Sequence, residues 1–162
     1  MPLHIAVDPL HGPQIAALLQ AHLDEMHRIS PPESVHALDL ARLRAPDITF
    51  WSAWEGDALL GCAALRELDS THGEVKSMRT EPAARRRGVA AALLTQVMDE
   101  ASRRGYRRLS LETGTQPKFA PARALYARFG FETCGPFAGY VEDPCSTFMT
   151  RALSGAQDGT RQ

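Results

Sequence analysis

The sequence predicts one layered α/β domain with a mixed sheet. The first observation is the order of its patterns, because seven strand-like and four helix-like segments alternate along residues 3–153. The second is its size and composition, since 162 residues with 44% hydrophobic and 23% charged side chains suit a single buried core. We therefore expect a single domain over residues 1–153 and a frayed tail over residues 154–162.

The first predicted elements are a short strand and two helices. Residues 3–7 have a strand pattern, and Pro13 then opens a helix. The apolar side chains of this helix recur every three or four positions: Ile15, Leu18, Leu19, Leu23 and Met26. Ser30-Pro31-Pro32 ends it. A second short helix ends before Pro46 and carries three apolar residues: Val35, Leu38 and Leu43.

Three strands are predicted next. Residues 48–55 are rich in β-branched and aromatic side chains, and residues 59–68 follow after the turn signal Glu55-Gly56-Asp57. These two segments therefore predict a hairpin. Residues 74–80 are the third strand.

The clearest helix covers residues 89–104. Its apolar residues form one stripe: Val89, Leu93, Leu94, Val97, Met98 and Ala101. Gly105 is placed to cap its end, because glycine adopts the left-handed conformation that ends many helices. Residues 109–113 then alternate as a strand.

A last short helix and two strands close the predicted domain. Residues 121–129 form the helix, which Gly130 ends. One side of this helix carries Ala122, Leu125, Tyr126 and Phe129. The closing strands are residues 131–134 and 147–153.

Charge and composition argue against several classes of partner. A net charge of −1 gives no overall attraction to nucleic acid or to an anionic membrane. The first residues lack the features of a signal peptide, and no segment approaches the ~20 apolar residues of a membrane span. Three cysteines (Cys62, Cys134 and Cys145) have no metal-ligand spacing. We expect a cytoplasmic protein with reduced thiols and no metal.

A basic loop over residues 80–90 joins a predicted strand to the clearest helix. The start of a helix presents free backbone N–H groups and the positive end of the helix dipole, which suit an anion. Gly88 lets the backbone approach a phosphate, and Ala90 keeps the first turn slim. Arginines add charge at positions 85, 86 and 87. A solvated basic turn is the other interpretation. An RNA-binding patch is disfavoured, because no aromatic residues are interleaved with the arginines.

Two motifs resemble those of the GNAT superfamily of N-acetyltransferases. Arg85-x-x-Gly88-x-Ala90 resembles the family signature [Gln/Arg]-x-x-Gly-x-[Gly/Ala]. Downstream, Ala122-x-x-Leu125-Tyr126-x-x-x-Gly130-Phe131 is similar to the late helix of the family. Residues 111–114 and 140–144 resemble a bacterial subgroup of the YsnE type. The resemblance implies a mostly antiparallel sheet of about seven strands with about four helices, in which strands 74–80 and 109–113 splay apart.

The resemblance also implies a donor substrate, acetyl-coenzyme A, and a set of residues that binds it. Backbone amides of residues 86–90 would hold the pyrophosphate, and the backbone of Met78 and Thr80 would pair with the pantetheine arm. A backbone N–H near Met78 or Arg79 would stabilise the oxyanion. The implied coenzyme-binding residues are Met78, Arg79, Thr80, Arg85, Arg86, Arg87, Gly88, Val89, Ala90 and Phe119.

Two residues are candidates for the proton transfers of acetyl transfer to an amine. Tyr126 stands where the family carries a tyrosine that donates a proton to the departing thiolate. Glu74 lies eleven residues before Arg85, the spacing at which some family members place a general base. The alternatives are a half-buried structural tyrosine, a solvent-facing carboxylate at a strand edge, and a water relay in place of the base.

The resemblance implies a small-molecule or peptide amine as the acceptor. Residues 27–34 and 140–145 would border its site, where Asp143 or Glu142 is a candidate contact for a cation. Phe119 replaces an asparagine that the family often has, and the loop before it is longer. A non-catalytic acyl-coenzyme A-binding regulatory module is the alternative function, and a homodimer is a common family assembly. Nucleic-acid binding through the arginines is a third alternative.

Overall fold

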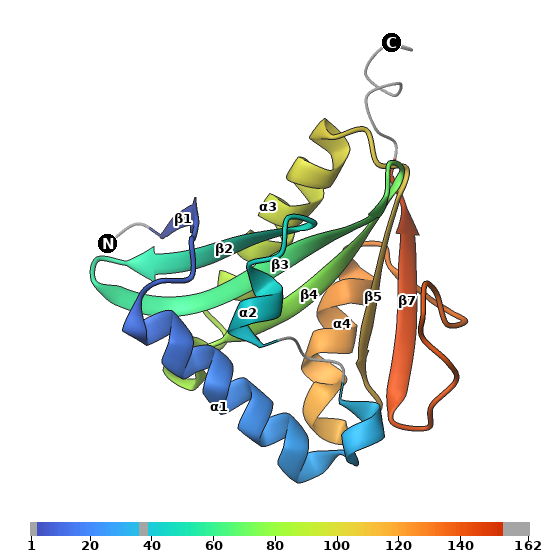
Figure 1. Ribbon diagram of the computed structural model, residues 1–162, viewed down its shortest axis with the longest axis horizontal. Coiled ribbons are helices and arrows are strands. Elements are labelled where there is room, and N and C mark those ends of the chain that lie inside the picture. Colours follow the sequence, from blue (N-terminus) through green and yellow to red (C-terminus); the bar gives the residue numbers. More distant parts are fainter. Residues whose placement is uncertain (1–2, 36–38, 154–162) are drawn as a thin grey trace. The chain divides into compact units, whose positions relative to one another are not determined.

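The computed structural model describes residues 3–35 and 39–153, which form one mixed sheet with helices (Figure 1). Its strand order is β1-β2-β3-β4-β5-β7-β6. β4 and β5 are parallel, whereas the pairs β1/β2, β2/β3, β5/β7 and β6/β7 are antiparallel. The strands are β1 (His4–Val7), β2 (Ile48–Glu55), β3 (Ala58–Asp69), β4 (His72–Thr80), β5 (Arg108–Gly114), β6 (Glu132–Cys134) and β7 (Ser146–Ala152). The predicted fold class is confirmed.

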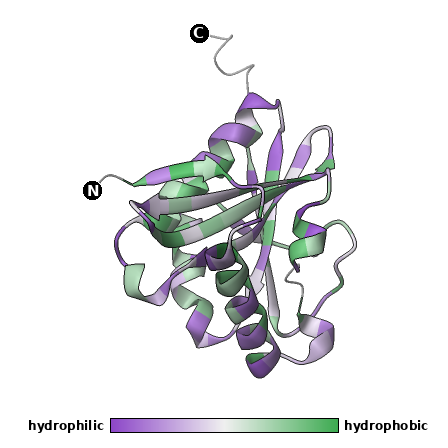
Figure 2. Ribbon diagram, turned by 60° about the vertical axis from the view of Figure 1, so that its left-hand side comes forward, coloured by the Kyte–Doolittle hydropathy of each residue, from purple (hydrophilic) through white to green (hydrophobic). Residues whose placement is uncertain are grey.

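The four predicted helical regions are present in the described residues, and one of them differs in form. The helices are α1 (Pro13–Ile29), α2 (Leu40–Leu43), α3 (Val89–Arg103) and α4 (Ala120–Arg128). Three short 3-10 turns each begin with a proline: η1 (Pro32–Ser34), η2 (Pro82–Ala84) and η3 (Pro117–Phe119). Hydrophobic and hydrophilic residues alternate along the helices in Figure 2.

The second predicted helix was too long. Val35 is the C-cap of the separate turn η1. α2 is a second, single helical turn, and Asp39 is its N-cap. The Asp39 carboxylate accepts a hydrogen bond from the backbone N–H of Arg42, at 2.9 Å, and so supplies a new N-cap. Leu38 and the predicted tail over residues 154–162 lie outside the described residues.

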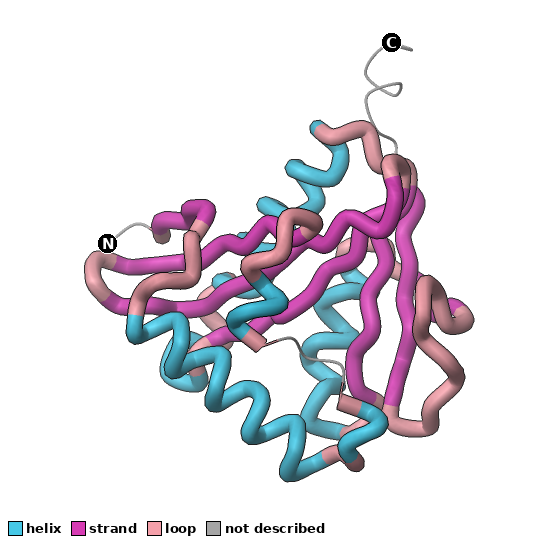
Figure 3. The backbone as a smooth tube through the Cα atoms, viewed as in Figure 1, coloured by secondary structure: helices cyan, strands magenta, loops and turns pink. Residues whose placement is uncertain are grey.

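One compact unit comprises the described residues up to Arg66 together with Lys76–Val97. It contains the predicted hairpin, which Figure 3 shows as two long strands joined by a short turn. The buried side chains of α1 pack against those of β2 and β3, and each stabilises the fold by about 1.5–3 kcal/mol. The buried members of this core are Leu10, Ile15, Leu18, Leu19, Leu43, Phe50, Leu59, Cys62 and Ala64.

The second compact unit comprises Glu67–Val75 and the described residues from Met98 onward. β5 lies at its centre, with Leu109 and Leu111 fully buried. β4 pairs with β5 from His72↔Arg108 to Val75↔Leu111, although β4 continues to Thr80 and β5 to Gly114. This short pairing agrees with the splay expected of these two strands.

The helices α3 and α4 end in the same capping motif. Gly105 and Gly130 both have positive φ, at 84° and 90°. The N–H of the residue after each glycine returns to a carbonyl five residues earlier, from Tyr106 to Ala101 and from Phe131 to Tyr126, each at 3.0 Å. These are Schellman motifs, and they confirm the predicted role of both glycines.

Candidate active site

The basic loop begins where β4 ends, in the first compact unit. The N–H of Glu81 donates to the carbonyl of Leu60 at 2.8 Å, which ties the start of the loop to β3. Arg86 and Gly88 then both have positive φ, at 67° and 81°, directly before α3 starts at Val89. Turns of this kind collect backbone N–H groups into a concave surface that suits an anion. Together with the free N–H groups of the first helical turn, the loop has the geometry of a phosphate site.

Gly88 is required by its backbone conformation. Its φ of 81° disfavours other residues, whereas a Cβ added there would meet no atom within 4 Å. The surrounding protein therefore leaves open space beside this glycine. The predicted reason, close approach of a phosphate, stays a prediction. Arg86 adopts a similar φ without being glycine, which costs about 1–3 kcal/mol, and strain of this kind is concentrated at functional sites.

The three loop arginines differ in their surroundings. Arg85 and Arg86 are exposed. The Arg87 guanidinium donates to the Glu55 carboxylate at 2.6 Å, with the two side chains 46% and 28% exposed. A surface ion pair of this kind stabilises by only about 0–1 kcal/mol, so an arriving phosphate can compete for Arg87.

β4 changes direction just before the residues predicted to contact the pantetheine arm. Ser77 has a φ of 54°, and its carbonyl accepts a hydrogen bond from the buried Cys62 thiol at 3.3 Å. Met78, Arg79 and Thr80 follow, each partly exposed. A residue with positive φ inside a strand interrupts the regular ladder and redirects the N–H and carbonyl groups beside it.

The Arg79 side chain is engaged by α1. Its guanidinium donates to the Glu25 carboxylate at 2.7 Å, and both side chains are 13% exposed. The Arg79 side chain is thus engaged within the protein, and the predicted contribution of its backbone to coenzyme binding stays a prediction. Beside this pair lies His22, whose pKa is lowered to about 4 by burial and by the Arg79 charge, against an opposing effect of Glu25. No motif in the sequence indicated His22 or Glu25.

Glu74 lies in the second compact unit and is 1% exposed. The Tyr140 hydroxyl donates to its Oε2 at 2.6 Å. β4 lies between β3 and β5 in the strand order, so Glu74 is not at a sheet edge. The alternative of a solvent-facing edge carboxylate is therefore wrong.

Tyr126 is 5% exposed, so it is buried and not half-buried, and its catalytic role stays a prediction beside the structural alternative. Its ring meets Phe131 edge-on, with the ring centroids 5.8 Å apart. Burial raises the pKa of the Tyr126 phenol above its usual range, and the Glu112 carboxylate raises it further. The phenol is therefore a neutral hydrogen-bond donor at physiological pH.

Glu112 is a neighbour of Tyr126 for which the sequence predicted no role. It lies on β5, and the Ser146 hydroxyl donates to its Oε2 at 2.8 Å. The one available signal was strand alternation, which turns Glu112 to the face opposite the buried Leu109 and Leu111.

Phe119 packs against its own loop. A Cβ on Gly114 would clash with the Phe119 ring, so only glycine permits this contact. The Arg123 guanidinium donates to the carbonyls of Gly114 and Gln116, at 2.6 and 3.1 Å, and braces the same loop. The predicted packing of Phe119 on the coenzyme stays a prediction.

The two acidic candidates for an acceptor contact have different surroundings. Asp143 accepts a hydrogen bond from the backbone N–H of Cys145 at 2.7 Å, which closes a local turn. Glu142 is exposed. Asp143 thus has a structural function in its loop.

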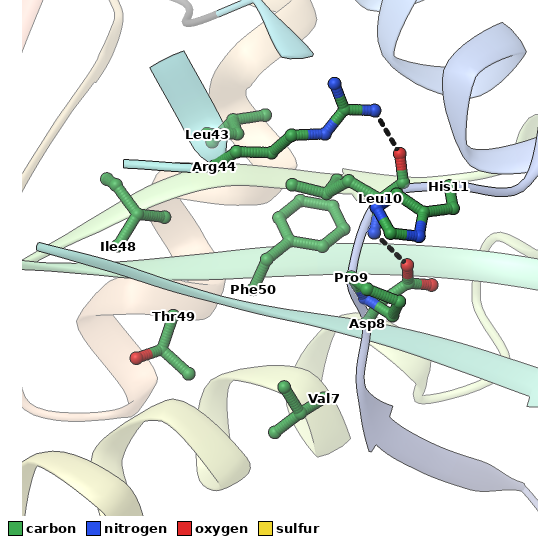
Figure 4. A pocket seen from close by; sticks show the side chains of 10 residues that line it. All are labelled: Val7, Asp8, Pro9, Leu10, His11, Leu43, Arg44, Ile48, Thr49 and Phe50. Atoms are coloured by element: carbon green, nitrogen blue, oxygen red, sulfur yellow. Dashed lines mark hydrogen bonds between the residues drawn. The ribbon is translucent and has the colours of Figure 1, made fainter. Parts of the chain in front are cut away.

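A separate open hollow of about 430 Å³ lies in the first unit, beside the start of α1 (Figure 4). Its lining holds none of the predicted site residues. Asp8 accepts from the N–H of Leu10 at 2.7 Å, and Arg44 donates to the carbonyl of Leu10 at 2.6 Å. These bonds hold Leu10 at a φ of 67° and brace the turn into α1.

Among the described residues, no group of three or more His, Cys, Asp or Glu side chains could hold a metal ion. The three cysteines are free thiols, as predicted. No helix of the described ranges has the length and apolar character needed to cross a membrane.

Comparison with known proteins gives consistent matches. The model of the acetyltransferase (GNAT) family matches residues 15–131. YsnE, an uncharacterized N-acetyltransferase of Bacillus subtilis, is 58% identical over 151 residues, which are 93% of this chain and 100% of that protein. The IAA acetyltransferase of Azospirillum brasilense is 38% identical over 141 residues, covering 86% and 89%.

A solved structure of similar fold is a GNAT family acetyltransferase from Elizabethkingia anophelis with acetyl-CoA bound. It superposes with a TM-score of 0.69 at 18% identity, covering 93% of this chain and 98% of that one.

Proposed function

The chain belongs to the acetyltransferase (GNAT) family, as a YsnE-like member, and on that premise we propose a residue-level mechanism for its acetyl transfer. The enzyme is an acyl-coenzyme A-dependent N-acetyltransferase. In the proposed reaction, the nitrogen lone pair of a primary amine attacks the acetyl carbonyl carbon directly. The C–S bond then breaks, the sulfur leaves with its electron pair, and the products are an amide and coenzyme A.

The conformation of the basic loop carries the proposal for the donor site. Positive φ at Arg86 and Gly88, followed at once by the start of α3, supports a pyrophosphate held by the N–H groups of residues 86–90. The exposed Arg85 and Arg86 side chains add positive charge there. The residues present therefore fit the diphosphate of acetyl-coenzyme A.

The kink of β4 supports the residues proposed to bind the pantetheine arm and the thioester of acetyl-coenzyme A. Ser77 at a φ of 54° redirects the backbone of the next residues. Met78 and Thr80 are proposed to bond the pantetheine arm through their backbone groups, and the N–H of Met78 or Arg79 to stabilise the oxyanion.

Glu74 is the proposed general base. An alkylamine with a pKa near ~10.4 is almost fully protonated at neutral pH, so a proton must leave it before attack. The burial of Glu74 removes competing water, and its hydrogen bond from Tyr140 holds the carboxylate.

Tyr126 is the proposed partner of the departing thiolate. A thiol has a pKa near ~8.5, below that of a tyrosine, and burial raises the pKa of Tyr126 further. The proton therefore stays closer to the phenol oxygen. In place of the full proton transfer by a general acid that the resemblance implies, we propose that Tyr126 contributes mainly a hydrogen bond that stabilises the developing thiolate.

A calorimetric titration with acetyl-coenzyme A tests the donor site, with Gly88→Glu as the control. Saturable binding that the control loses supports the loop assignment. Thiol release with a panel of amino acids, polyamines, aminoglycosides and peptides with free N-termini then tests for turnover. Binding without thiol release from any acceptor would favour a non-catalytic acyl-coenzyme A-binding module instead.

A further inference from the structure

The loop over residues 135–145 sends one side chain into the interior of the second unit. Its Tyr140 hydroxyl donates to Glu74 Oε2 at 2.6 Å, although the two residues are separated by 66 positions in the chain. Glu74 is 1% exposed, so this bond is made away from water. A hydrogen bond to a charged group is stronger than one between neutral groups, and burial strengthens it further.

The Tyr140 ring packs against two other aromatic rings. Its centroid lies 5.0 Å from that of Phe137 and 5.5 Å from that of Phe148, and these two rings also meet each other at 6.1 Å. Phe148 belongs to β7, opposite Glu112 of β5, so one wall of this cluster is fixed by the sheet.

The backbone before Tyr140 is fixed as well. The N–H of Tyr140 donates to the carbonyl of Phe137 at 3.0 Å, and Ala138, inside this turn, has a φ of 51°. A strained turn that is closed by a hydrogen bond and packed against neighbouring rings restricts the orientation of its side chain. The hydroxyl of Tyr140 is therefore preorganised toward Glu74.

We propose that Tyr140 is a positioning residue that orients the Glu74 carboxylate for proton transfer from the acceptor amine. This inference rests on the proposed role of Glu74 as the general base. A carboxyl group turns freely about its last bond, and a fixed donor on Oε2 selects one plane for it. Because a misplaced base loses much of its effect, the hydroxyl contributes to turnover and not to coenzyme binding.

A structural role is the competing explanation, in which Tyr140 only fastens its loop. The chain provides a control in the same unit, a tyrosine–glutamate bond whose acceptor, Glu67, is exposed. The Tyr106 hydroxyl donates to Glu67 Oε1 at 2.5 Å, and Tyr106 is 1% exposed. Tyr106→Phe therefore removes a tyrosine–glutamate bond of similar length that lies outside the proposed site.

The test compares Tyr140→Phe, Glu74→Gln, their double variant and Tyr106→Phe in the full chain. Phenylalanine keeps the ring packing, and thermal unfolding shows that each variant is folded. Thiol release from acetyl-coenzyme A is measured with the fastest amine of the panel and, in parallel, with water as the acceptor.

We expect Tyr140→Phe to lower kcat by about tenfold, and the KM for acetyl-coenzyme A to change by less than about twofold. Glu74→Gln should lower kcat by roughly 100-fold. In the Glu74→Gln background, Tyr140→Phe should have almost no further effect, because its contribution passes through the carboxylate. Tyr106→Phe should leave kcat unchanged.

The outcomes separate the two proposals. If Glu74→Gln lowers kcat and Tyr140→Phe does not, the positioning role is wrong and the base assignment stands. Equal losses from Tyr140→Phe in both backgrounds would also overturn it, since the hydroxyl would then act independently of Glu74. If Glu74→Gln leaves kcat unchanged, the base assignment fails and the positioning role fails with it. If Tyr106→Phe lowers kcat as much as Tyr140→Phe does, both hydroxyl groups have only a structural role, and the positioning role of Tyr140 is wrong.

Discussion

The carbonyl of Tyr126 accepts a hydrogen bond from the N–H of Phe131 at 3.0 Å, and the two rings meet edge-on with centroids 5.8 Å apart. Both contacts depend on the left-handed turn at Gly130, whose φ is 90°. The Tyr-x-x-x-Gly-Phe pattern is therefore a Schellman cap that also fixes the proposed thiolate partner. The same residues serve the end of α4 and the position of Tyr126.

Gly130→Ala should destabilise the protein and lower its turnover. The new Cβ forces a positive φ on an L-residue and would lie 2.8 Å from Arg151 Nε, so we expect a loss of about 1–2 kcal/mol in the free energy of unfolding. Urea unfolding measures this loss. Gly135→Ala is the control, because a Cβ there meets no atom within 4 Å. Equal unfolding midpoints for the two variants would contradict the capping role.

Tyr126→Phe should lower kcat by roughly 100-fold, since it removes the hydrogen bond to the departing sulfur and leaves the ring packed on Phe131. Thiol release measures kcat, and thermal unfolding should change little. Because the pKa of the phenol is raised, we also expect the wild-type enzyme to lose no turnover through phenol ionisation below pH ~10. Turnover of the variant within a few-fold of wild type would remove Tyr126 from the mechanism.

Gly88→Ala should weaken acetyl-coenzyme A binding by about tenfold or more, because the loop conformation that collects its N–H groups is strained by about 1–2 kcal/mol with a Cβ present. Calorimetric titration measures the Kd. Gly12→Ala is the control, since Gly12 has an ordinary φ of −82° at the start of α1 and open space around it. Unchanged affinity in Gly88→Ala would show that the loop conformation does not support the coenzyme.

His22 should make stability depend on pH in the mildly acidic range. Its pKa falls from 6.5 to about 4 on folding, so the unfolded chain binds the extra proton first. The free energy of unfolding therefore keeps its full value above pH ~6.5. It falls by up to about 3 kcal/mol as the pH drops towards ~4. Urea unfolding at several pH values measures this slope.

In His22→Gln, the free energy of unfolding should fall less as the pH drops. His27 is an exposed histidine of the same helix, and the variant His27→Gln should show the same loss of stability as wild type. Parallel slopes for all three proteins would show that His22 does not resist protonation.

Local patterns predicted most of the fold. The apolar periods of α1 and α3, the Gly56 turn of the hairpin and the glycine ends of α3 and α4 all depend on residues close together in the chain. The loop motif predicted a turn before α3, but it assigned Gly88 to close approach of a phosphate and did not predict the positive φ that the structure shows. The short region before Pro46 was the exception, because the Asp39 cap competes with the apolar period there.

The site itself divides in the same way. The sequence by itself determined the elements, the turn of the basic loop and the family motifs, because each follows from the backbone preferences of neighbouring residues. Only the tertiary structure decided that Tyr140 reaches Glu74 across 66 positions and that Arg79 reaches Glu25 across 54. Such contacts depend on how distant strands and loops pack, and no local preference of either partner encodes the distance between them.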